Sequence, residues 1–136
     1  MTFDPRTIAA EVYQQLSTLR GNRDKEDKVV KQQKSQATEL YTYLSTWGLL
    51  RLKAEEEALK EQEGKKAVVT AFFKCLGQLS SEESNKFIGR PGLQVLADST
   101  KTSADEYLGL TGLGLSIAQE FSFWATAIYA DVKGEE

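Results

Sequence analysis

Histidine is absent from the 136-residue chain, and cysteine occurs only once. Because histidine is the commonest general base and the commonest metal ligand, its absence argues against most hydrolytic and zinc-dependent chemistry. The single cysteine, Cys75, cannot form an internal disulfide, and its apolar surroundings in AFFKCL predict a buried, reduced thiol. We therefore expect a cytoplasmic protein that is not an enzyme and that uses neither a metal nor a cofactor.

Long apolar runs are lacking as well. Charged residues or glycines interrupt each apolar stretch well before the ~20 residues that cross a bilayer. The opening MTFDPRTIAAE lacks the basic and then apolar order of a signal peptide. The sequence thus predicts neither membrane contact nor secretion.

An excess of positive charge is missing too, since 17 basic residues stand against 20 acidic ones and the formal net charge is -3 at pH 7. A freestanding nucleic-acid-binding protein normally carries a global cationic signature, so any contact with a polyanion must here be local. With 40% hydrophobic and 27% charged residues, the composition is that of a globular protein. A chain of this length fits one domain, residues 1–136.

Strand-like alternation never exceeds four residues, and no internal repeat is visible. Helical periodicity or a run of strong helix formers instead marks five segments, at residues 4–20, 24–47, 49–63, 64–79 and 103–128. Ser80 with Glu83, and Ser103 with Glu106, fit the capping box that opens a helix. The GRPG sequence at 89–92 predicts a loop. The fold class is therefore all-α, a single compact bundle of about five to six helices.

The segment 103–128 has the clearest apolar stripe, which we expect to be buried: Tyr107, Leu110, Gly114, Ile117, Phe121, Trp124 and Ile128. Leu108 and Leu115 form a partial second row, which predicts that neighbours cover this helix on two sides. Glycine is unfavourable inside a helix unless a neighbour packs closely, so Gly109, Gly112 and Gly114 predict close helix packing. Three aromatic residues, Tyr43, Phe123 and Tyr129, fall off the apolar stripes and are open for an interface.

Five glutamates between residues 55 and 63 are the densest candidates for a magnesium site. Adjacent residues on a helix point about 100° apart, so these carboxylates cannot converge on one ion, and we interpret them as a solvated face. The five are Glu55, Glu56, Glu57, Glu61 and Glu63.

The basic segment, residues 20–34, is the one local excess of positive charge. Its six cations, set against three acidic residues, are Arg20, Arg23, Lys25, Lys28, Lys31 and Lys34. At about 100° per residue the lysines lie opposite the apolar stripe that begins at Val30, and a one-sided basic face can track a phosphate backbone. The alternative is an ordinary solvated helix face, because many helices have this pattern.

Three segments together resemble the small helical subunit of type III CRISPR effector complexes, in particular the Cmr-type (type III-B) small subunit. They are IAAEVYQQL, ATELYTYLSTWGLLRLKAEEEAL and EYLGLTGLGLSIAQEFSFWATAIYAD. The closing segment resembles the end of that family most closely, through Tyr107, Leu108, Phe121, Phe123, Trp124, Ala125 and Ala127.

The resemblance implies a noncatalytic subunit that acts in antiviral defence and is present in several copies stacked end to end. Its partners would be the other subunits of the complex, further copies of itself, and guide and target RNA. The basic segment would line the RNA channel, with Arg51 and Lys53 as additional candidate contacts. This chain departs from many members of the family in its acidic net charge and its glycine-rich last helix.

A different reading of the same residues stays open. The chain would then be a helical adaptor or structural subunit that binds another protein through the surface at residues 109–114 and the off-stripe aromatics, without contacting nucleic acid.

Overall fold

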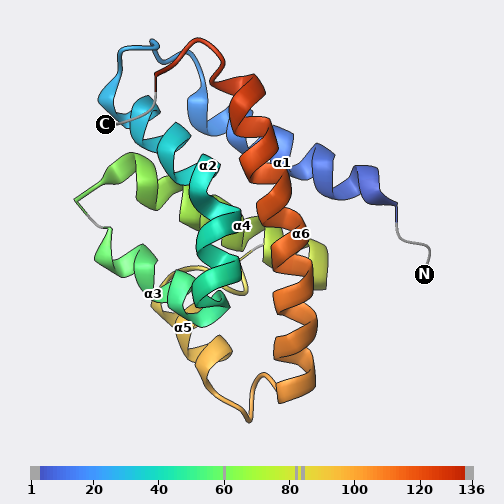
Figure 1. Ribbon diagram of the computed structural model, residues 1–136. Coiled ribbons are helices and arrows are strands. Elements are labelled where there is room, and N and C mark those ends of the chain that lie inside the picture. Colours follow the sequence, from blue (N-terminus) through green and yellow to red (C-terminus); the bar gives the residue numbers. More distant parts are fainter. Residues whose placement is uncertain (1–3, 60, 82, 84, 134–136) are drawn as a thin grey trace.

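The computed structural model describes residues 4–59, 61–81, 83 and 85–133 (Figure 1). These residues form helices and no strand, so the predicted all-α bundle is confirmed. The helices are α1 (Pro5–Arg20), α2 (Lys28–Trp47), α3 (Leu49–Ala58), α4 (Glu63–Ser81), α5 (Gly89–Ala97) and α6 (Ala104–Ile128).

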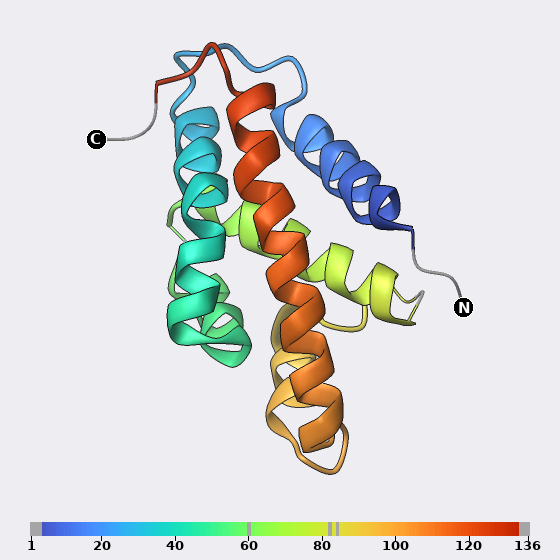
Figure 2. The ribbon, with the colours of Figure 1, turned by 45° about the vertical axis from the view of Figure 1, so that its right-hand side comes forward.

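The long helix α6 organises the bundle. It lies between α1 and α2, and α4 crosses behind it (Figure 2). The shorter helices α3 and α5 pack together at one end (Figure 1). The core contains apolar residues from all six helices, including Leu16, Leu40, Leu52, Phe72, Leu96 and Phe121. None of the helices within the described ranges has the length and apolar content to span a membrane.

Local capping signals set several helix ends where the sequence predicted them. The Asp4 carboxylate accepts a hydrogen bond from the Arg6 amide at 3.0 Å, and proline follows as the first residue of α1. Gly48, with φ 88°, separates α2 from α3. At the start of α6, Ser103 and Glu106 form the predicted capping box, with bonds of 3.2 and 3.1 Å.

Other helix ends differ from the prediction. The second helix begins at Lys28 instead of near residue 24, because the Asp27 carboxylate caps it by accepting the Val29 amide at 2.8 Å. Helix α3 ends at Ala58, and Ser80 lies inside α4, so the Ser80 capping box does not form.

The GRPG sequence opens α5 instead of forming a loop. A Cβ at Gly92 would lie 2.2 Å from the backbone carbonyl of Phe87, so only glycine lets the chain turn so closely on itself. That contact is invisible in a local pattern.

The stripe on α6 is only partly buried. Ile117 and Phe121 are fully enclosed, whereas Tyr107, Leu110, Trp124 and Ile128 pack at the edge of the core. The expected second row fails at its start, because Leu108 is 69% exposed.

The predicted close packing at the α6 glycines is confirmed at Gly114 but not at Gly109 or Gly112. A Cβ at Gly114 would lie 3.3 Å from Phe72 Cζ, whereas nothing lies within 4 Å at Gly109 or Gly112. The expectation that Tyr129 is open for an interface is wrong, because this side chain is fully buried.

Candidate nucleic-acid interface

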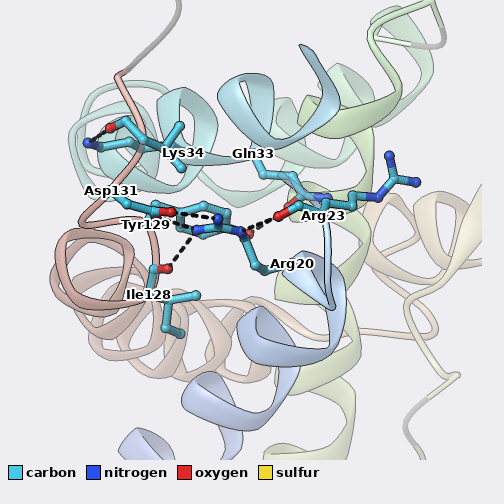
Figure 3. A network of polar contacts seen from close by, with 8 residues as sticks. Arg20, Arg23, Gln33, Lys34, Ile128, Tyr129 and Asp131 are labelled. Atoms are coloured by element: carbon cyan, nitrogen blue, oxygen red, sulfur yellow. Dashed lines mark hydrogen bonds and ion pairs between the residues drawn. The ribbon is translucent and has the colours of Figure 1, made fainter. Parts of the chain in front are cut away.

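Arg20 joins the end of α1 to the end of α6 (Figure 3). Its guanidinium donates two hydrogen bonds to the Asp131 carboxylate, at 2.7 and 3.0 Å, and one to the Ile128 carbonyl at 3.1 Å. These hydrogen bonds hold the pKa of Asp131 below its usual range. Only 14% of the Arg20 side chain is exposed. We call this arrangement the Arg20 clamp, and it leaves the guanidinium committed to the protein's own groups.

A polar network continues from the Arg20 clamp into the core. The Tyr129 hydroxyl donates to Gln33 Oε1 at 2.7 Å (Figure 3). The amide of Gln33 donates to the Leu19 carbonyl at 3.3 Å. Burial raises the pKa of Tyr129, which therefore stays protonated as a donor. Lys34 also belongs to this network, because its ammonium donates to the Val132 carbonyl (Figure 3).

The other four cations of the basic segment lie nearer to solvent. Arg23 pairs with Asp27 at 3.1 Å and Lys31 with Glu26 at 3.2 Å, and both pairs are partly exposed. Such pairs are weak and screened by salt, so a phosphate can replace the carboxylate.

Lys25 and Lys28 are exposed, and neither forms an ion pair with a carboxylate among the described residues. Lys25 nevertheless lies close enough to Asp131 to help lower the pKa of that carboxyl. The structure therefore reduces the predicted basic face to Lys25, Lys28 and Lys31, with Arg23 at its edge. The buried Val30 lies on the opposite side of α2 from Lys28, as predicted. Lys34 lies one turn after Val30 on the same side and is half-buried, so its predicted position opposite the apolar stripe is wrong.

Lys53 is removed from the candidate contacts, because its side chain lies in the core with 1% exposed. Its ammonium bonds to Glu56 Oε1 at 2.8 Å and lies 4.9 Å from the centre of the Phe73 ring. The second oxygen of Glu56 accepts the Thr70 hydroxyl at 3.0 Å. Glu56 is thus buried, which also corrects the expectation that all five glutamates form a solvated face.

Arg51 remains exposed, and its guanidinium lies 4.3 Å from the centre of the Trp47 ring. Trp47 is itself 52% exposed. Trp47 is the last residue of α2, and Arg51 lies near the start of α3. Because a helix of 20 residues rises about 30 Å, this pair is separated from Lys28 by roughly that distance. The structure therefore does not bring Arg51 together with the basic segment in one patch.

The aromatic cluster of Tyr13, Phe123 and Trp124 is a feature that sequence reasoning largely missed. Tyr13 and Phe123 are 50% and 59% exposed, and each ring centre lies 5.2 Å from that of Trp124. Phe123 was expected to face solvent, and does. Tyr13 follows the buried Val12 and so points about 100° away from the stripe of α1, which was the available signal.

Reactive groups are few in the described part of the chain. Burial raises the pKa of Cys75, so this thiol stays protonated and unreactive. The described residues contain no group of three or more cysteine, aspartate or glutamate side chains placed to hold a metal ion. Comparison with protein-family models, curated proteins and solved structures finds no match to this chain.

Proposed function

We propose that this chain is a noncatalytic small subunit of a type III CRISPR RNA-guided effector complex, in which several copies stack and support the binding of guide and target RNA. The observation that supports this best is the set of Lys25, Lys28 and Lys31 around the start of α2, of which Lys25 and Lys28 are exposed and form no ion pair with a described carboxylate. The resemblance of three sequence segments to that family supplies the identity of the assembly.

The position of these lysines favours a phosphate backbone. They surround the amino-terminal end of α2, where the Asp27 carboxylate already accepts the Val29 amide, so the lysine ammonium groups and not the helix dipole would bind the phosphate. Three contacts in one copy give little affinity at physiological salt, and the net charge of -3 opposes the approach of a polyanion. Copies aligned along one RNA repeat the contacts, so weak sites sum to stable binding.

A second candidate is the protein adaptor without nucleic-acid contact, and the aromatic cluster favours it. Tyrosine, tryptophan and phenylalanine are enriched at protein interfaces, and two rings half exposed on adjacent helices form such a surface. The two candidates differ in whether RNA binding requires Lys25, Lys28 and Lys31.

The test is charge reversal at Lys25, Lys28 and Lys31, all to glutamate. The chain is isolated from its native cells with its associated subunits, and RNA binding is titrated at two salt concentrations. We expect the affinity for target RNA to fall about tenfold or more, with a flatter dependence on salt, because each lost phosphate contact removes counterion release.

A matched control makes the same change of charge in and around α5, at the opposite end of the bundle (Figure 1), at the exposed Lys86, Arg90 and Lys101. It should bind RNA like the wild type. If the two triple variants bind RNA equally well, or if the isolated assembly holds no RNA, the CRISPR proposal fails and the adaptor takes its place.

A further inference from the structure

The aromatic cluster has an unusual neighbour, the carboxylate of Glu120. Glu120 lies one turn before Trp124 on α6 and accepts a hydrogen bond from the indole Nε1–H at 3.2 Å. Within the described ranges no cation pairs with it. A carboxylate offers about four acceptor sites, so most of its capacity is unused.

The rings stand around Trp124 at steep angles. Tyr13 from α1 is inclined by 62° to the indole plane and Phe123 by 82°. Helices α1 and α6 run side by side at this point (Figure 2), so the cluster bridges two rigid elements. Large exposed aromatic surface next to an unpaired carboxylate suits a cation, because a ring face attracts positive charge.

We propose that Glu120 and the aromatic cluster bind an arginine side chain presented by a partner protein. A planar guanidinium can stack on an aromatic ring while it donates a charged hydrogen bond to the Glu120 oxygen that does not accept the indole N–H, whereas an ammonium cannot stack. The negative charge of Glu120 disfavours a nucleic acid at this surface. The site therefore goes beyond the RNA contact proposed for α2 and does not depend on it.

A shallow hollow of about 330 Å³ adjoins the cluster and has room for a residue that flanks the arginine. Its lining comprises Tyr13, Ser17, Arg20, Gly21, Ala127 and Ile128. The charge of Arg20 does not repel the incoming guanidinium strongly, because Asp131 accepts two hydrogen bonds from it.

The probes are two blocked pentapeptides, Gly-Leu-Arg-Leu-Gly and its twin with neutral citrulline in place of arginine. Binding to the full chain is followed through the indole N–H resonance of Trp124, assigned with a Trp47→Phe variant. We expect the arginine peptide to shift this resonance and to bind about tenfold more tightly than the citrulline peptide, from one charged hydrogen bond and one ring contact.

Glu120→Gln retains an oxygen acceptor for the indole and removes the charge, so the fold should survive while the preference for arginine disappears. Glu39→Gln, at an exposed carboxylate on α2, removes the same charge elsewhere and should keep the preference. Equal binding of the two peptides, binding of neither, or an unchanged preference in Glu120→Gln would overturn the site.

Discussion

Lys53 and Glu56 form an ion pair that is almost completely enclosed by the protein. Moving two charges out of water costs desolvation free energy. Their attraction offsets this cost only when the geometry of the pair is good and its remaining polar atoms are hydrogen-bonded. Here Thr70 donates to the free oxygen of Glu56, and the Phe73 ring lies near the ammonium. The pair is therefore satisfied, and the loss of one partner matters more than the loss of both.

Replacing Lys53 with methionine should leave the Glu56 carboxylate buried without its cation. We expect the free energy of unfolding to fall by about 3 to 5 kcal/mol. The double variant Lys53→Met with Glu56→Leu removes both charges at similar volume and should lie close to the wild type or above it. Urea unfolding measures all three proteins, and equal losses in the single and double variants would contradict this account.

The Arg20 clamp should make stability depend on pH. The pKa of Asp131 is lowered in the folded state by hydrogen bonds from Arg20, so its stabilising contribution is complete above the unfolded value of about 4 and is lost as pH falls through the folded value. Asp131→Asn lacks this contribution at every pH.

We therefore expect the stability gap between wild type and Asp131→Asn to be widest near neutral pH and to close under acid conditions. Thermal unfolding at a series of pH values measures the gap. Glu39→Gln, which removes an exposed carboxylate, controls for net charge. A gap that stays constant from neutral pH to below pH 3, on the order of one unit under the unfolded value, would count against the clamp.

For the candidate site, helical periodicity predicted which side chains face solvent, but not which of them bind partners elsewhere in the chain. Lys28 faces solvent as expected, because its position opposite Val30 follows from helix geometry alone. Arg20 and Lys34 find their partners 111 and 98 residues away, and no local pattern reveals such contacts. Lys53 was misplaced because the glutamates around it predicted a solvated helix face, whereas it lies in the core and pairs with Glu56.

At the scale of the helices, replacing glycine with alanine distinguishes the helix propensity of a residue from its packing against a neighbouring helix. Gly112 lies on the exposed side of α6 with nothing within 4 Å of an added Cβ, whereas a Cβ at Gly64 in α4 would lie 2.2 Å from the Val29 carbonyl. The Gly64 amide also donates to Gln32 Oε1 at 2.9 Å, which fixes the approach of α4 to α2.

Gly112→Ala should raise the free energy of unfolding by about 0.5 to 1 kcal/mol, because alanine favours the helix and meets no neighbour. Gly64→Ala should lower it by about 1 to 3 kcal/mol, because the helices must move apart. Chemical denaturation compares the two variants. A stabilised Gly64→Ala would mean that α2 and α4 tolerate a wider separation.

The existence of most helices followed from periodicity and capping, but the role of each helix did not. GRPG begins a helix because Phe87 packs its backbone against Gly92, and α3 hides a charged pair that a solvated helix would expose. In α3, contacts with Thr70 and Phe73 of α4 outweighed the local preference, whereas the close approach at Gly92 lies within residues 87–92.

For the molecule as a whole, some helices pack against several neighbours and others against few. Helix α6 packs against α1, α2 and α4, whereas α5 packs mainly against α3. We expect amides of α5 to exchange with solvent faster than those in the centres of α2 and α6, because fewer contacts must break to open them. Hydrogen exchange followed by mass spectrometry tests this, and equal protection of α5 and α6 would show one cooperative unit.

The Arg20 clamp also constrains the chain as a polymer. It ties together two residues that are 111 positions apart, and closing so long a loop costs entropy that is recovered only when the ends meet. We expect it to form after α2, α4 and α6 have packed, beyond the folding transition state. Contacts of that kind leave the folding rate unchanged and slow unfolding, so loss of the clamp should shorten the time that each molecule stays native.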